Sequence, residues 1–263
     1  MVLPSRTVEG YGASTYGDAF ADAYDRWYAD LPDLAACVTT VMELAGATGR
    51  VLELGVGTGR IAVELADAGA RVVGVDSSEA MLERLRTKDC DHRIETVHGA
   101  MEDLATLADA QPGIFDEPFD LVLLAYNTLF NLIDDGAQQR CLAAAAGLLG
   151  PDGRLIVEAF VPDDSSEAGA RIGLRSMTAD EVVLSVTEHD RVSQLITGQF
   201  VSLDEHHGVR LRPWAIRYRS PEQLDALAAD AGLRLLERWA DFDRGEFASG
   251  CERHVSVYAR STT

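Results

Sequence analysis

The sequence predicts an α/β fold in which helices cover both faces of a doubly wound, mostly parallel sheet. Three observations support this prediction. Short apolar runs alternate with helical patterns between about residues 48 and 160. These runs are almost continuously apolar, as expected for strands buried on both faces. With 263 residues, 47% of them apolar, the chain can also form a large core.

The chain begins with helical patterns. Aromatic residues recur at helical spacing in the segment 17–30, which indicates one helix with an aromatic face. That face consists of Phe20, Tyr24, Trp27 and Tyr28. The segment 34–47 predicts a second helix, which ends near two glycines. We therefore expect residues 1–47 to form an N-terminal helical lid.

From residue 48 the strands and helices alternate. Ser77 or Ser78 can cap the helix that follows the second strand, because a hydroxyl oxygen accepts a free N–H of the first turn. The predicted strands are 50–55, 71–76, 93–99, 119–126 and 154–160. The predicted helices between them are 60–69, 79–88 and 138–149.

The pattern changes after residue 160. Three strand-like runs joined by short turns favour an antiparallel insertion at about 180–219. A helix follows, with Ser220 as its cap, Pro221 at its first position and Gln223 completing a capping box. The runs 233–242 and 254–260 are expected to close the edge of the sheet as a hairpin.

Composition limits the partners that we expect. The chain has 23 basic and 43 acidic residues, a net charge of −20, which repels nucleic acid and anionic membranes. Its four cysteines show no CxxC spacing, and its acids and histidines show no metal-ligand spacing, so we expect no metal. The N-terminus lacks a signal-peptide pattern, and no apolar run reaches the roughly 20 residues of a membrane span. These features predict a cytoplasmic protein that acts on a small molecule, and a homo-oligomer is compatible with them.

The stretch VLELGVGTGR, residues 51–60, carries the main functional signal. Gly55, Gly57 and Gly59 occupy the first strand-to-helix turn, where ligands bind in open α/β sheets. Without side chains, the backbone can turn tightly and approach a ligand closely. Asp76 ends the second strand, where a carboxylate can accept hydrogen bonds from ribose hydroxyls. Glu53 lies inside the first strand, which is a costly place for a charge without a partner.

Two cofactors compete for this turn. A dinucleotide fold normally spaces its glycines as GxGxxG, whereas this chain has GxGxG. The combination E-x-G-x-G-x-G, with an acid closing the second strand, resembles the class I S-adenosylmethionine-dependent methyltransferases, from about Tyr24 to the end of the chain. The resemblance implies a Rossmann-like domain over 48–263, with a seven-stranded sheet whose last strand is antiparallel.

The resemblance also implies a cofactor site for S-adenosyl-L-methionine. Glu53 and the three glycines would lie against its amino acid part. Asp76 would hold the ribose, and Met81 would pack on the adenine. Other residues at expected cofactor positions are Tyr24, Ser77, Ala100, Met101, Glu102 and Tyr126.

A wider pattern narrows the resemblance to small-molecule methyltransferases of actinobacterial secondary metabolism. It consists of VEAFVPD at 157–163, the segment 210–233 and HVSVY at 254–258. Some relatives methylate amino groups of sugars or antibiotics, so the resemblance implies an N-methyltransferase of antibiotic biosynthesis. Its acceptor site would include Tyr16, Tyr24, Asn127 and Phe130 as catalytic residues. Glu158, at the end of the fifth strand, is a further polar candidate.

Three alternatives stay open at this point. An O-methyltransferase of a hydroxylated metabolite fits the same cofactor site. An NAD-dependent oxidoreductase uses the same kind of sheet. A nucleotide-binding protein without catalysis is the third. A DNA amino methyltransferase is disfavoured, because AYNTL at 125–129 lacks the two prolines of the turn that those enzymes carry.

Overall fold

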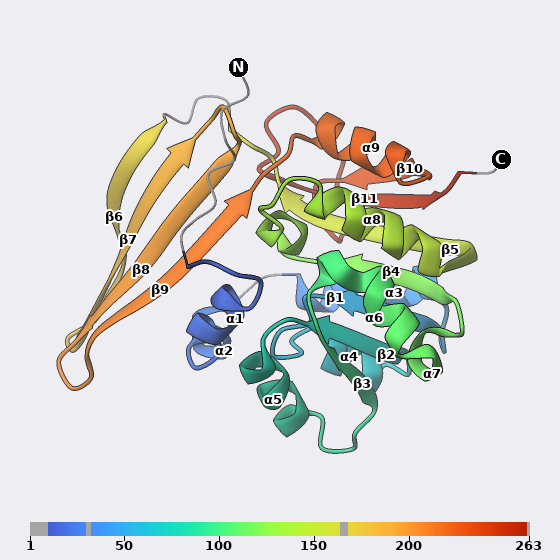
Figure 1. The fold of residues 1–263 in the computed structure, drawn as a ribbon, viewed down its shortest axis with the longest axis horizontal. Helices are drawn as coiled ribbons and strands as arrows, with labels where there is room; N and C mark the ends of the chain where they lie inside the picture. The colour runs from blue at the N-terminus through green and yellow to red at the C-terminus, as the bar shows by residue number, and fades with distance from the viewer. Residues whose placement is uncertain (1–9, 30–32, 164–167, 262–263) are drawn as a thin grey trace.

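The computed structural model describes residues 10–29, 33–163 and 168–261, which form two separate sheets (Figure 1). The strands of the larger sheet are β1 (Arg50–Leu54), β2 (Arg71–Asp76), β3 (Ile94–His98), β4 (Phe119–Leu124), β5 (Leu149–Phe160), β10 (Leu233–Trp239) and β11 (Arg253–Arg260). Their order is β10-β11-β5-β4-β1-β2-β3. The pairs among β1 to β5 are parallel, and β11 runs antiparallel to both β5 and β10. The predicted sheet with an antiparallel last strand is confirmed.

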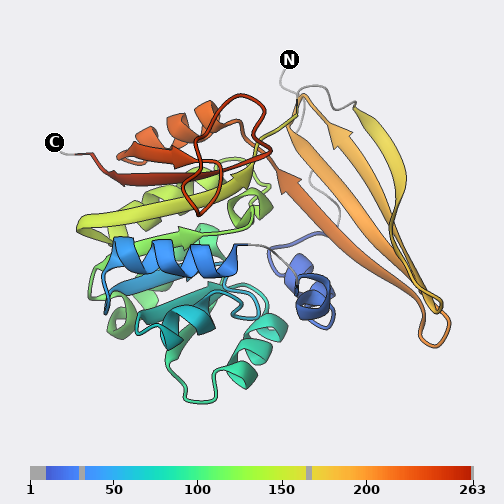
Figure 2. The same ribbon diagram turned by 180° about the vertical axis from the view of Figure 1, so that it is seen from behind.

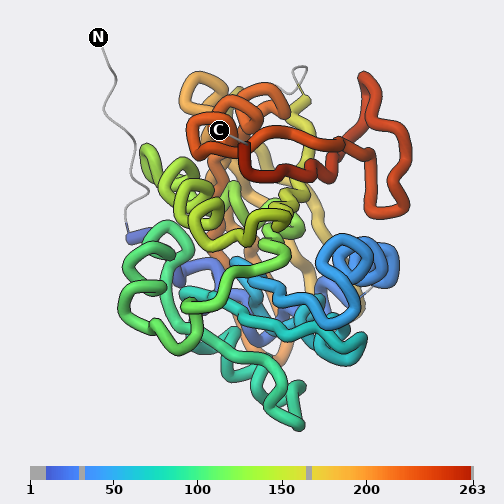
Figure 3. Tube along the Cα trace, turned by 90° about the vertical axis from the view of Figure 1, so that its right-hand side faces the viewer, coloured from blue at the N-terminus to red at the C-terminus, as the bar shows by residue number. Residues whose placement is uncertain are grey.

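Helices cover both faces of this sheet, as predicted. Alternate residues of β1 explain why both faces need cover: Leu52 joins one buried core and Val51 the other. The core that contains Leu52 is covered by α6 (Leu104–Ala110), α7 (Pro112–Phe115), α8 (Ala137–Leu148) and α9 (Pro221–Asp230). The core that contains Val51 is covered by α3 (Leu34–Ala45), α4 (Ala62–Asp67) and α5 (Glu79–Lys88). In Figure 3 the blue α3 and the green α6 and α8 lie on opposite sides of the strands. None of the helices in the described ranges is long and apolar enough to cross a membrane.

Local signals predicted the starts of two helices correctly. Ser78, rather than Ser77, caps α5, because its side chain accepts a hydrogen bond from the main-chain N–H of Met81. Ser220 and Gln223 form the expected capping box at the start of α9. These are short-range interactions, which is why residue type and spacing predict them.

The second sheet is the antiparallel insertion, and it has one strand more than expected. Its strands, in sequential order, are β6 (Gly169–Met177), β7 (Glu181–Asp190), β8 (Leu195–Asp204) and β9 (Gly208–Arg217). The strand β6 was not predicted. Ala170, Ile172 and Leu174 alternate with polar residues or glycine, but two glycines among nine residues weaken the strand pattern. In Figures 1 and 2 the sheet stands beside the main body, with the N-terminal helices between the two.

The single aromatic helix expected at 17–30 is two short helices, α1 (Thr15–Phe20) and α2 (Tyr24–Trp27). In the turn between them, Asp22 pairs with Arg210 at 2.6 Å and Arg212 at 2.6 Å, both on β9. The break thus lies where long-range ion pairs hold the chain. Residues 1–9 and 30–32 of the predicted lid lie outside the described residues.

Candidate active site

The glycine turn after β1 needs its glycines for different reasons. All three have a positive φ: 72° at Gly55, 57° at Gly57 and 79° at Gly59. A Cβ on Gly55 would lie 2.3 Å from Cγ2 of Thr128, so only a bare backbone fits there. A Cβ on Gly59 would lie 2.8 Å from Cγ of Leu85, in the core. Gly57 has no neighbour within 4 Å of that position, so its backbone is open to a ligand.

Asp76 connects this turn to the end of β2. Its Oδ2 accepts the main-chain N–H of Gly57 at 2.8 Å, and its Oδ1 accepts that of Ser78 at 2.8 Å. Burial raises the pKa of the Asp76 carboxyl, and the two N–H donors lower it in part. Both oxygens are thereby held in place, and each keeps a lone pair for a further donor.

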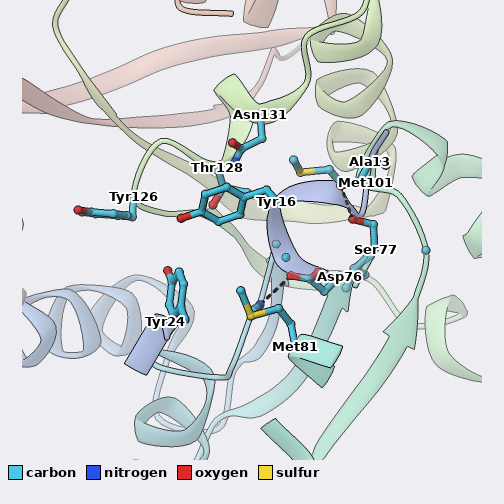
Figure 4. A pocket seen from close by; sticks show the side chains of 15 residues that line it. Ala13, Tyr16, Tyr24, Asp76, Ser77, Met81, Met101, Tyr126, Thr128 and Asn131 are labelled. Carbon is cyan, nitrogen blue, oxygen red and sulfur yellow. Dashed lines mark hydrogen bonds between the residues drawn. The ribbon is translucent and has the colours of Figure 1, made fainter. Parts of the chain in front are cut away.

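A cavity of about 100 Å³ lies over the turn, and most of the predicted cofactor residues line it (Figure 4). A neighbouring cavity of about 140 Å³ shares Ala13, Ser77, Met101 and Asn131 with it, and we call the two together the cleft. The predicted residues that line the first cavity are Tyr16, Tyr24, Gly55, Gly57, Asp76, Ser77, Met81, Met101 and Tyr126. Ala100 and Glu102 line the second.

Four of the predicted cofactor-binding and catalytic residues do not line the cleft. Phe130 is fully buried and packs edge to face on Phe160, with ring centroids 5.3 Å apart. The side-chain oxygen of Asn127 accepts the main-chain N–H of Phe160 at 2.7 Å. Gly59 packs against the core, and Glu53 is buried within β1. The roles assigned to these residues stay predictions.

Glu53 is an unusual buried acid. Its Oε2 has no hydrogen-bond partner within the described residues. Burial raises the pKa of its carboxyl to about 8, while the nearby charge of Arg60 opposes that rise. Its position in β1, two residues before Gly55, leaves a buried oxygen that a further donor would satisfy.

The structure adds cleft residues that the sequence did not indicate. Thr128 and Asn131 come from the 3₁₀ turn Thr128–Asn131, which directly follows the predicted residues Tyr126 and Asn127. Gly17 of α1 lies against the start of α5, where a Cβ would be 2.3 Å from Cβ of Ser78. Ser77 donates a hydrogen bond to the carbonyl of Ala13 at 2.9 Å. The N-terminal segment is thereby held against the cleft, and no local pattern in the sequence signals that contact.

Tyrosines form one end of the cleft. Tyr16 stacks on Phe20 at 4.3 Å, and its hydroxyl lies 3.4 Å from that of Tyr28. Tyr28 packs against the rings of Tyr24 at 4.7 Å and Tyr126 at 5.6 Å. Burial raises the pKa of both Tyr16 and Tyr24, so both hydroxyls are neutral near pH 7. We call Tyr16, Tyr24, Tyr28 and Tyr126 the tyrosine cluster.

Comparison with known proteins agrees with this geometry. A family model described as a methyltransferase domain matches residues 51–153. The cypemycin N-terminal methyltransferase of a Streptomyces species is 33% identical over 191 residues, 72% of this chain and 74% of that protein. This chain belongs to the S-adenosylmethionine-dependent methyltransferases. The resemblance noted in the sequence is confirmed, the cofactor is S-adenosylmethionine, and the family assignment replaces the NAD-dependent and non-catalytic alternatives.

Solved structures of this methyltransferase family share the fold. The CcbJ methyltransferase of Streptomyces caelestis is 38% identical, with a TM-score of 0.87 over 96% of this chain and 100% of that one. An S-adenosylmethionine-dependent methyltransferase of Clostridium acetobutylicum is 14% identical, with a TM-score of 0.76 over 93% of this chain and 99% of that one. The sugar N-methyltransferase KedS8 of a Streptoalloteichus species is 21% identical, with a TM-score of 0.67 over 100% and 99%.

The residues present in this methyltransferase fit S-adenosylmethionine. The open backbone at Gly57 and the fixed carboxylate of Asp76 lie side by side in the cleft. Met81 and Met101 supply apolar surface to it. The unpartnered oxygen of Glu53 lies in the strand that leads into the turn. Hydrogen-bond acceptors and apolar side chains are therefore both available for a nucleoside that carries an ammonium group.

Proposed function

We propose that this enzyme transfers the methyl group of S-adenosylmethionine to an amine nitrogen of a small molecule in natural-product biosynthesis. The relative at 33% identity is named as an N-terminal methyltransferase, which favours nitrogen as the acceptor. The observation that carries the proposal is the cleft itself, which runs from Asp76 and Gly57 to the tyrosine cluster. In this proposal the nucleoside binds at the Asp76 end of the cleft and the acceptor at the aromatic end.

In this proposal the cofactor residues act as the resemblance implies. Asp76 accepts the ribose hydroxyls, Gly55 and Gly57 lie against the amino acid part, and Met81 and Met101 pack on the adenine. Ser77 keeps the N-terminal segment over the site through its bond to the carbonyl of Ala13. Ala100 and Glu102 belong to the adenine end, since they line the second cavity of the cleft.

The acceptor side has a different composition. S-adenosylmethionine supplies an electrophilic methyl carbon on sulfur, and its transfer to an amine yields S-adenosylhomocysteine and one proton. Tyr16, Tyr24 and Tyr126 orient the acceptor and exclude water, which is the main requirement of such a displacement. Asn127 and Phe130 act indirectly. Their contacts with Phe160 hold the turn that carries Tyr126.

A panel of acceptors tests the proposal. The purified enzyme is incubated with methyl-labelled S-adenosylmethionine and trialanine, prolinamide, an aminodeoxyglucoside, catechol or p-cresol. We expect label on the nitrogen of at least one amine, identified by mass spectrometry. Label on a phenol oxygen and on no amine would establish the O-methyltransferase alternative instead. Binding of S-adenosylhomocysteine without transfer to any amine would reject the proposed reaction while leaving the cofactor site intact.

We also propose that two copies associate through the outer face of the four-stranded sheet. Cross-strand rows on this face are apolar, with Leu174, Leu184, Val201 and Leu211 in one and Met177, Val182, Leu203 and Val209 in the next. Leu174 is 60% exposed and Val209 69% exposed. Because these rows hold no charge, a second copy can pack on them despite the net charge of −20. Light scattering should show a dimer that Leu174→Asp dissociates, and a monomeric unmodified chain would refute this interface.

A further inference from the structure

Two further cavities adjoin the tyrosine cluster, since Tyr126 lines both of them. One has a volume of about 300 Å³ and the other about 400 Å³. Both are lined by Tyr126, Glu158 and Arg253, and Tyr126 also lines the cleft. A molecule in either cavity would therefore contact the residue that bounds the cofactor site, and Glu158 would face that molecule.

Main-chain and ionic contacts fix the Glu158 carboxylate. It lies near the end of β5 and is 8% exposed. Its Oε2 accepts the main-chain N–H of Tyr126 at 2.8 Å. Its Oε1 lies 3.6 Å from Nη1 of Arg253, which is too far for a hydrogen bond. Within the described part of the chain Oε1 accepts no hydrogen bond, so this oxygen can accept one from a bound molecule.

The charged groups around Glu158 come from several elements. Asp33, at the start of α3, is bonded to Arg253 of β11 and is thereby already paired. Arg60, just before α4, has its guanidinium 5.9 Å from the ring centroid of Tyr126. Burial raises the pKa of the Glu158 carboxyl, Arg253 and Arg60 lower it in part, and Asp33 adds to the rise. Cys37 of α3 lines the same cavity, and burial raises the pKa of its thiol, so it is uncharged.

We propose that Glu158 binds the acceptor amine through Oε1 and removes a proton from it. The acceptor class is a primary or secondary aliphatic amine, which is an ammonium ion near pH 7. Its N–H bond breaks, the electron pair stays on nitrogen as the lone pair that attacks, and the proton goes to Oε1. Glu158 becomes a neutral acid and returns the proton to solvent after turnover. This step rests on the proposed amine methylation and adds the group that prepares the nitrogen.

Other groups near the site are less suited to this step. Tyr16 and Tyr24 hold their protons, because burial raises the pKa of each hydroxyl. Asp33 is engaged by Arg253, and Glu53 lines none of the cavities described above. Glu158 combines an oxygen free to accept with a place at a cavity wall and a main-chain link to Tyr126.

The pH dependence of the Glu158→Gln variant tests this role. For trialanine, whose α-amine has a pKa near 8, the neutral fraction falls about 20-fold between pH 8.5 and 6.5. The unmodified enzyme should lose less than about threefold in kcat/KM over this range, because Glu158 takes the proton. The variant can use only the neutral amine, so its kcat/KM should fall about 20-fold over the same range. If prolinamide or the aminodeoxyglucoside is the active acceptor, the pH interval is shifted with its own pKa, from about half a unit above that pKa to about one and a half units below it.

Controls separate this role from a structural one. Glu95→Gln makes the same substitution at an exposed position of β3 and should follow the unmodified enzyme. Binding of S-adenosylhomocysteine and the melting temperature should be unchanged in Glu158→Gln, because the amide oxygen can still accept the Tyr126 N–H. An equal loss of activity at both pH values would show a structural role and overturn the inference, as would an unchanged pH profile. If no amine is methylated at all, the proposed function is wrong, and the role of Glu158 that depends on it is rejected as well.

Discussion

Replacing Asp76 by alanine is the most direct perturbation of the proposed cofactor site. Its two oxygens accept the N–H groups of Gly57 and Ser78, each at 2.8 Å, and the same oxygens face the cleft. In Asp76→Ala the ligand loses a charged acceptor, and the two N–H donors lose their partner. A hydrogen bond to a charged group contributes about 1.5 to 3 kcal/mol. Since about 1.4 kcal/mol is a tenfold change, affinity for the cofactor should fall about 10- to 100-fold.

Isothermal titration with S-adenosylhomocysteine measures this loss. Asp91→Ala serves as the control, because the Asp91 side chain is 79% exposed and Asp91 lines none of the cavities of the site. Circular dichroism should show that both variants are folded. A folded Asp76→Ala protein with unchanged affinity would refute the assignment of the ribose site to this carboxylate.

Two further predictions concern the glycine turn and the acid beneath it. Gly55→Ala places a Cβ 2.3 Å from Thr128 at a positive φ, whereas the Cβ of Gly57→Ala has open space around it. The Gly55 variant should therefore have the lower melting temperature. Equal melting temperatures of the two variants would contradict the packing role of Gly55. The pKa of Glu53 is raised in the folded state to about 8 from 4.5, so the folded protein binds its proton more tightly than the unfolded chain. Ionisation of Glu53 therefore lowers the free energy of unfolding as the pH rises from 4.5 to about 8. Between pH 6 and 9 the loss should be about 2 to 3 kcal/mol. Urea denaturation of the ligand-free protein should show this loss, and Glu53→Gln should abolish it; an equal loss in the variant would rule out Glu53 as its source.

Patterns within short stretches were sufficient to predict the main sheet and many of the residues that line the cleft. Strands buried on both faces read as continuous apolar runs, and β1 to β5 were found in this way. The glycine turn and Asp76 were predicted because each ends a strand that the pattern had already located. The capping box at Ser220 needs only residues three positions apart. In each case the physical cause acts over a few residues, so it is visible in the sequence.

Contacts between distant segments determined the features that the sequence did not predict. The ion pairs of Asp22 with Arg210 and Arg212 join residues almost 190 positions apart, at the point where the expected helix divides. Glu158 acquires its place beside Tyr126 only when β4 and β5 pair, because the link is a hydrogen bond across strands. Phe130 is enclosed by Phe160 rather than lining the cleft. Sequence periodicity thus indicated the strands and their buried faces, whereas the packing of distant segments determined which side chains line the cleft.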